Sequence, residues 1–136
     1  MATRNSVRAI RLGAVYATAV FLAGFVLGTV RLLVIAPRTG DLAAVLLELP
    51  IILGISWLVF GGLARRQAPL PVAGRGLAGL AAFLTLIVLE LILAAFIVPG
   101  GPAAMMAGWF TLTGGIGLAG QIAFALIPVW HPAARN

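Results

Sequence analysis

Residues 12–36 read LGAVYATAVFLAGFVLGTVRLLVIA, and the only charged side chain in this run is Arg31. A helix needs roughly 20 predominantly apolar residues to cross the hydrocarbon core of a bilayer. This run exceeds that length and contains neither proline nor a cluster of polar residues. It therefore predicts a transmembrane helix.

Three further runs have the same character, at residues 42–64, 76–98 and 103–129. Hydrophobic residues make up 62% of the 136-residue chain and charged residues only 9%, whereas about a quarter of the residues are charged in an ordinary globular domain. The four runs use almost the whole length. We therefore predict an all-α integral membrane protein, a four-transmembrane-helix bundle that forms one transmembrane domain over residues 1–136.

The connecting segments divide the four predicted helices into two helical hairpins. Pro37 and Gly40 predict the end of the first helix and its turn, because proline cannot continue the helical hydrogen-bond ladder and glycine readily takes turn conformations. The sequence PGGP at residues 99–102 predicts the turn of the second hairpin in the same way. A hydrophilic linker at residues 65–71 separates the two hairpins.

The basic residues predict the orientation of the helices. All nine are arginine, and most of them lie before the first run, in the 65–75 region or after the fourth run. The positive-inside rule then predicts that both termini are cytoplasmic, an N-in/C-in arrangement. Arg38 is the exception, and Asp41 partly offsets it. Topology explains the net charge of +6, so no nucleic-acid partner is expected. A bias towards Ala, Arg and Gly suggests a GC-rich bacterial genome, and hence the bacterial inner membrane.

Aromatic residues near the ends of the fourth run match the belts that anchor helices at membrane interfaces. Trp109 and Trp130 are therefore predicted to be interfacial anchors. His131, the only histidine, is predicted to face solvent at the interface.

Small residues predict where the helices pack, because transmembrane helices associate through close approach of their backbones. Gly24 and Gly28 have GxxxG spacing in the first run. Gly114, Gly117 and Gly120 belong to a glycine-dense fourth run. We expect these five glycines to lie at helix contacts; for the fourth run, the alternative is a gate or a cofactor groove.

Three charged residues inside the runs, Arg31, Glu48 and Glu90, are the candidate functional residues. A charge inside the membrane is costly, so it is a functional hypothesis by default. Counting about 1.5 Å of rise per residue from the flanking arginines puts all three in the half of the bundle away from the cytoplasm. Arg31 and Glu48 lie on either side of the Pro37–Gly40 turn, and we expect them to form an ion pair.

Glu90 then leaves the cluster with one excess negative charge if both glutamates are ionised. Protonation, a bound cation or a basic group from a partner would each balance that charge. The alternative without function is a structural ion pair that fixes the helix register, with Glu90 facing a watery crevice.

The sequence offers little equipment for catalysis. It has no cysteine and one histidine, and no hydroxyl–base pair or phosphate-binding loop accompanies the charged residues. We therefore expect no enzyme activity, no metal site and no cofactor. The leading hypothesis is a non-catalytic accessory subunit in the lipid bilayer, partnered by further copies of itself or by a membrane complex.

Two other functions remain open. One is a proton- or cation-coupled small transporter or channel that uses Glu90 and Glu48. The other is a binder of a lipid, quinone or pigment in the glycine-lined groove of the fourth helix.

Overall fold

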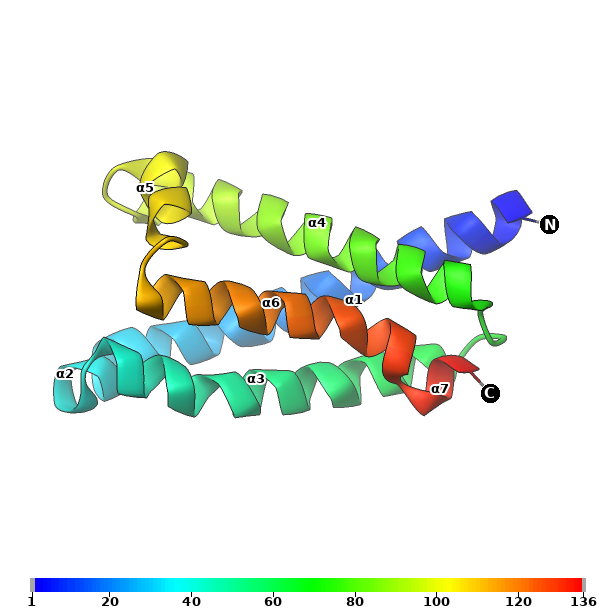
Figure 1. The fold of residues 1–136 in the computed structure, drawn as a ribbon, viewed down its shortest axis with the longest axis horizontal. Helices are drawn as coiled ribbons and strands as arrows, with labels where there is room; N and C mark the ends of the chain where they lie inside the picture. The colour runs from blue at the N-terminus through cyan, green and yellow to red at the C-terminus, as the bar shows by residue number, and fades with distance from the viewer. Residues whose placement is uncertain (1, 136) are drawn as a thin grey trace.

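The computed structural model describes residues 2–135, and within that range the protein is a helical bundle without strands (Figure 1). Four helical stretches are long and apolar enough to cross a membrane: Thr3–Thr39, Asp41–Ala64, Val72–Ile97 and Leu112–Arg135. The prediction of a bundle of four long apolar helices is confirmed. Met1 and Asn136, the end residues of the predicted domain, lie outside the described residues.

The first hairpin is more continuous than the sequence predicts. It contains α1 (Ala2–Val30), the π-helical segment η1 (Arg31–Ile35), α2 (Ala36–Thr39) and α3 (Asp41–Ala64). The segment that carries the first three arginines is thus helical, because α1 begins at Ala2 and not near residue 12. Pro50 lies inside α3 without interrupting it.

The predicted helix end at Pro37 is wrong. The chain widens at Arg31–Ile35, where the N–H of Ala36 bonds to the carbonyl of Arg31, and it then continues to Thr39. Pro37 sits in the first turn of α2, where a missing N–H is tolerated. The reversal into α3 takes place at Gly40, whose φ of 88° favours glycine.

The second hairpin contains α4 (Val72–Ile97), α5 (Gly101–Gly108), α6 (Leu112–Trp130) and the short α7 (Pro132–Arg135). The prediction of one uninterrupted helix over residues 103–129 is wrong, because the chain breaks between α5 and α6. Thr111 caps α6: its Oγ1 accepts a hydrogen bond of 3.1 Å from the N–H of Gly114. A side chain at Gly114 would overlap the carbonyl of Gly108, so glycine is required at this corner.

The two hairpins are close together at one end and diverge towards the other. In the bundle α1 packs against α3 and α4, and α6 packs against the same two helices, so α1 and α6 are diagonal to each other. Figure 1 shows both termini at the end where the hairpins meet, and α2 and α5 at the end where they separate.

Two glycines allow the close contact between helices at the terminal end. Gly13 of α1 faces the backbone carbonyl of Ala78 in α4, and Gly79 of α4 faces the carbonyl of Ala125 in α6. A β-carbon at either glycine would overlap that carbonyl. The backbones therefore approach as closely as small residues permit.

Aromatic side chains fill the interior next to these contacts. The Tyr16 hydroxyl donates a hydrogen bond of 2.9 Å to the carbonyl of Phe124, linking the diagonal helices α1 and α6. The Tyr16 ring stacks on Phe124 with 4.4 Å between centroids and meets the edge of Phe60 at 5.2 Å. Tyr16 and Phe60 are fully buried. This aromatic layer closes the interior at the terminal end.

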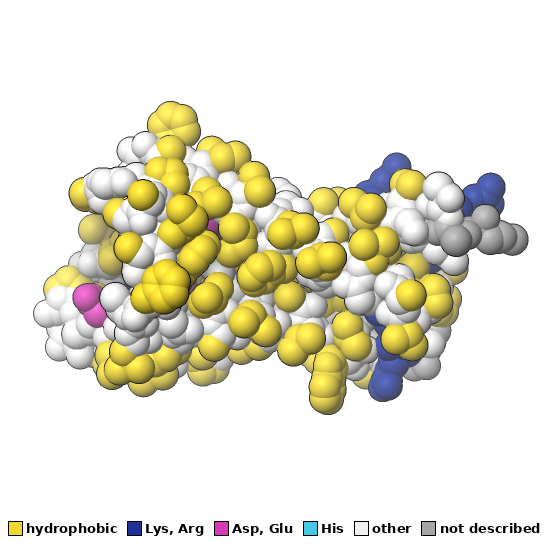
Figure 2. Space-filling view, turned by 45° about the horizontal axis from the view of Figure 1, so that its top comes forward, with side chains coloured by type: hydrophobic (Ala, Val, Ile, Leu, Met, Phe, Trp, Pro, Cys, Tyr) yellow, Lys and Arg dark blue, Asp and Glu magenta, His cyan; other side chains and the backbone are white. Residues whose placement is uncertain are grey.

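Hydrogen bonds from arginine side chains and from the backbone join neighbouring segments at the same end. Arg8 donates to the carbonyl of Ala68 at 2.6 Å, and Arg75 donates to the carbonyl of Val129 at 2.7 Å. The N–H of Leu70, in the loop before α4, donates a hydrogen bond to the carbonyl of Ala134 in α7. Figure 2 shows arginine gathered at this end of the visible face, mostly apolar side chains along its length, and an acidic side chain near the opposite end.

The close contact at Gly79 predicts a position-specific loss of stability. We expect Gly79→Ala to lower the free energy of unfolding by about 1–3 kcal/mol, because its β-carbon overlaps the backbone of α6. Gly76→Ala, one helical turn earlier on an open surface, is the matched control. It should leave stability unchanged or raise it slightly through helix propensity. Thermal unfolding in detergent, followed by circular dichroism, measures both; equal melting temperatures would contradict the contact.

Candidate functional site

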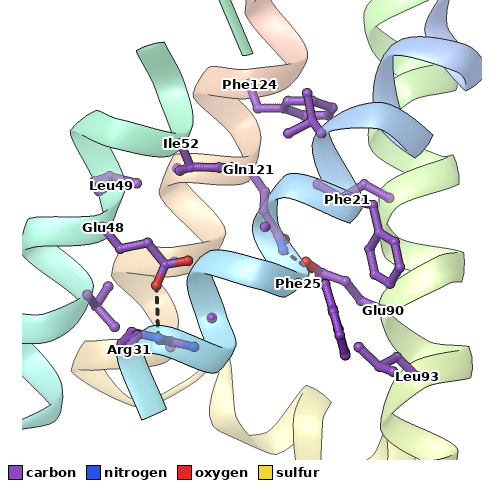
Figure 3. Close-up of a pocket in the computed structure, with 18 of the residues that line it drawn as sticks. Phe21, Phe25, Arg31, Glu48, Leu49, Ile52, Glu90, Leu93, Gln121 and Phe124 are labelled. Atoms are coloured by element: carbon purple, nitrogen blue, oxygen red, sulfur yellow. Dashed lines mark hydrogen bonds and ion pairs between the residues drawn. The ribbon is translucent and has the colours of Figure 1, made fainter. Parts of the chain in front are cut away.

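A cavity of about 450 Å³ lies between the two hairpins at the end where they diverge (Figure 3). This volume is within the range of small-molecule sites in proteins. Arg31, Glu48 and Glu90 all line it. Most of the remaining wall is apolar and comes from all four long helices: Val20, Phe21, Phe25, Val45, Leu49, Ile52, Leu86, Leu93 and Phe124.

Arg31 and Glu48 form the ion pair that their sequence positions predict. The Nε of Arg31 lies 2.8 Å from Oε2 of Glu48, and the two side chains are 29% and 18% exposed. Arg31 is the first residue of the widened helical turn that precedes Pro37. Such turns are frequent at functional sites, because they change the direction of a side chain without ending the helix.

Glu90 is not part of this ion pair. Its Oε2 accepts a hydrogen bond of 2.6 Å from Nε2 of Gln121 in α6. The single three-residue cluster expected from the sequence is therefore two separate polar links, which Figure 3 shows on different sides of the cavity. Within residues 2–135, the amide oxygen of Gln121, Oε1, is buried and has no hydrogen-bond partner.

Gln121 was not identified from the sequence as the hydrogen-bond partner of Glu90. It is one of the few polar residues in the fourth run, and a polar side chain in an apolar helix is expected to find a hydrogen-bond partner on a neighbouring helix. That rule points to Glu90 as soon as α4 and α6 are taken to be adjacent.

Each polar link joins the two helices of one hairpin. The Arg31–Glu48 pair connects the end of the first helix to α3, and the Glu90–Gln121 hydrogen bond connects α4 to α6. Neither link crosses from one hairpin to the other. The cavity is thus bounded by two internally linked hairpins that are held together at their opposite end.

All five glycines predicted to pack helices line the cavity, and three of them make no close helix contact. A β-carbon at Gly117 would meet nothing within 4 Å, and at Gly24 it would come no closer than 3.8 Å to Ile52. At Gly28 the nearest atom is the guanidinium of Arg31, also at 3.8 Å. The close helix contact predicted for Gly24, Gly28 and Gly117 is therefore absent.

The other two predicted packing glycines do make close contacts. A side chain at Gly120 would overlap Leu49 of α3, so this position lets α6 approach its neighbour. Gly114 makes its contact inside the second hairpin, against Gly108. The glycine-dense run thus serves both a helix contact and the cavity wall.

The two predicted interfacial tryptophans lie at opposite ends of α6. Trp109 is half-buried in the break between α5 and α6, and Trp130 is the last residue of α6 and is 69% exposed. Their anchoring role stays a prediction.

The prediction that His131 faces solvent is wrong, because its side chain is buried at 3% exposure. Its ring lies 4.1 Å from the Trp57 ring, and its Nδ1 accepts a hydrogen bond from the N–H of Ala133. Gly61 provides the room, since a β-carbon there would come within 2.8 Å of the imidazole. Across residues 2–135, no group of three or more His, Cys, Asp and Glu side chains is close enough to hold a metal ion.

No protein-family model, no curated protein and no solved structure matches the chain.

The Arg31–Glu48 pair predicts non-additive effects on stability. Removing one partner leaves a partly buried charge unpaired, so Arg31→Leu and Glu48→Leu should each lower the free energy of unfolding by about 1–3 kcal/mol. The double variant should lose less than the sum of the two, because it leaves neither charge behind. A double-mutant cycle of thermal unfolding in detergent measures the coupling. Strictly additive losses would contradict an energetically coupled pair.

Proposed function

We propose that the chain is a non-catalytic multi-pass protein of the bacterial inner membrane that binds an amphipathic small molecule in the cavity between its two hairpins. One observation carries this proposal: the three charged residues inside the apolar runs, Arg31, Glu48 and Glu90, all line one cavity of about 450 Å³. Charges in apolar helices are costly and tend to be kept for function. An apolar wall with a few polar groups is typical of ligand sites.

Ligand binding accounts for the glycines better than assembly does. The sequence favoured an accessory subunit that associates with copies of itself or with other membrane proteins, partly because of Gly24 and Gly28. Both glycines are half-buried in the cavity wall, and a β-carbon at either would come no closer than 3.8 Å to another side chain. Association with a partner stays a prediction that is independent of the cavity.

Binding is also favoured over conduction through the bundle. The aromatic layer of Tyr16, Phe60 and Phe124 lies between the cavity and the terminal end, and two of these side chains are fully buried. A channel or a proton-coupled carrier would need this layer to open. The tight glycine contacts beside it oppose such a motion.

The proposed orientation rests on the distribution of arginine. Seven of the nine arginines lie at the end of the bundle that carries both termini. They are in the first half of α1, in the 65–75 region and after α6. We propose that this end faces the cytoplasm, as the positive-inside rule requires.

The orientation can be tested by cysteine labelling, since the chain has no cysteine of its own. Gln67→Cys lies in the loop at the arginine-rich end, and Ala103→Cys lies in α5 at the opposite end. In intact bacterial cells, a membrane-impermeant maleimide should label Ala103→Cys only, and both variants should react after the cells are lysed. Labelling of Gln67→Cys in intact cells would reverse the proposed orientation.

The cavity can be tested by filling it. Gly117→Leu projects a side chain into open space in the cavity, whereas Gly54→Leu, on an exposed face of α3, adds the same atoms outside it. As probes we would use amphiphiles with one 12-carbon chain and different head groups: dodecylamine, dodecyltrimethylammonium and dodecanol. Native mass spectrometry of protein released from phosphatidylcholine nanodiscs counts bound probe.

We expect the wild type and Gly54→Leu to retain one molecule of at least one probe, and Gly117→Leu to lose it. Loss of more than about 10-fold in apparent affinity is the expected size, because the leucine occupies volume that the hydrocarbon chain needs. If the wild type retains none of the three probes, or if both leucine variants retain them equally, the cavity is not a binding site.

A further inference from the structure

The charges that face the cavity do not cancel. The first hairpin contributes one cation and one anion, Arg31 and Glu48, which neutralise each other at 2.8 Å. The second hairpin contributes Glu90, whose hydrogen-bond partner, Gln121, is a neutral amide. Among residues 2–135, no other charged residue lines the cavity. When both glutamates are ionised, the cavity carries one unbalanced negative charge next to the second hairpin.

Aromatic rings line the same cavity as this charge. In the view of Figure 3, the side chains of Phe21 and Phe25, from α1, appear on the same side of the cavity as Glu90 of α4. Both phenylalanines line the cavity, as does Phe124. The faces of aromatic rings attract cations, and the attraction is larger where water is excluded. Rings that share a cavity with a carboxylate of unbalanced charge therefore favour a positively charged ligand group.

Gln121 holds Glu90 in place without neutralising its charge. Its Nε2 is used by Glu90, and its buried Oε1 has no partner in the part of the chain that the structure describes. The carboxylate of Glu90 among apolar and aromatic side chains fits a protonated amine, which carries both a charge and several N–H donors.

A bare metal cation fits the site poorly. Calcium and magnesium ions require about six or more oxygen ligands, whereas the unbalanced part of this cavity offers Glu90 and Gln121 among apolar side chains. The rest of the volume is suited to hydrocarbon. The charge and the apolar wall together therefore indicate one molecule with a cationic head and an apolar body.

We propose that the cavity binds the ammonium group of a lipophilic amine, with Glu90 as the counter-ion. The head group lies between Glu90 and the phenylalanines of α1, and the apolar body fills the space lined by α3 and α6. This inference rests on the proposed ligand-binding function and adds the chemical class of the ligand.

The test compares head groups and charges while the hydrocarbon chain is held constant. Dodecylamine is protonated at neutral pH, as a lysine side chain is; dodecyltrimethylammonium has the charge without an N–H, and dodecanol has neither the charge nor the N–H. The variant is Glu90→Gln, which keeps the size of the side chain and its ability to bond with Gln121. The matched control is Asp41→Asn, which removes a carboxylate at the same end of the bundle but outside the cavity.

We expect the wild type to bind dodecylamine most tightly, dodecyltrimethylammonium next and dodecanol least, as measured by native mass spectrometry from phosphatidylcholine nanodiscs. Glu90→Gln should weaken dodecylamine about 10-fold or more, the size of a charge-assisted hydrogen bond, and should leave dodecanol unchanged. Asp41→Asn should bind all three probes as the wild type does.

The same experiment separates the possible failures and the possible sources of the amine. If dodecanol binds the wild type as well as dodecylamine does, or if Glu90→Gln leaves dodecylamine unchanged, the amine proposal is overturned while the binding function stands. If no probe binds, both are overturned. With phosphatidylethanolamine added to the nanodiscs, a lipid adduct that Glu90→Gln loses identifies a lipid amine as the ligand. If dodecylamine binding is undiminished and no phosphatidylethanolamine adduct forms, the ligand is identified as a free amine.

Discussion

The close contact of helix backbones at one end of the bundle is the constraint on which the rest of the structure depends. Gly13 and Gly79 bring α1, α4 and α6 together there, because any larger residue would overlap a carbonyl of the neighbouring helix. Long helices that meet at one end and are inclined to each other must separate at the other (Figure 1). The cavity is therefore a consequence of where the smallest residues lie, and the aromatic layer around Tyr16 gives it a floor.

At the diverging end, polar contacts hold each hairpin together and leave the hairpins separate. The Arg31–Glu48 and Glu90–Gln121 links each join the two helices of one hairpin, as polar side chains of apolar helices are expected to do. The unequal charges of the two links give the cavity its chemical character. One hairpin contributes a neutral pair and the other an uncompensated carboxylate in a cavity with aromatic rings, and the proposal of an amine ligand follows from that difference.

The sequence predicts the helices and one of the two polar links, and physical reasons explain what it does not predict. The length and apolar character of the runs are sufficient for four helices, and the separation of Arg31 and Glu48 across a short turn is sufficient for their ion pair. The break before α6 was missed, although Thr111 before an apolar run is a recognisable helix cap. Hydropathy alone does not detect such a break, because the residues on both sides of it are apolar.

The remaining errors concern which helices are neighbours. A GxxxG spacing identifies a helix face with small residues, but it does not say how close the next helix lies. At Gly24 and Gly28 the helices have already diverged, so this face lines a cavity. The partner of Glu90 and the burial of His131 against Trp57 depend likewise on the adjacency of α4 with α6 and of α3 with α7. That information is a property of the assembled bundle and is not contained in the spacing of residues along one helix.

The most direct test of this account is the distance between the hairpins at their diverging end in a lipid bilayer. Spin labels at Thr39→Cys, at the end of α2, and Ala103→Cys, in α5, report it by pulsed electron paramagnetic resonance in nanodiscs, without interference from native cysteine. We predict well-separated labels and a distance distribution that narrows when dodecylamine is added. Labels in close proximity with and without dodecylamine would mean that the hairpins are joined along their whole length, and that the cavity between them does not exist in the membrane.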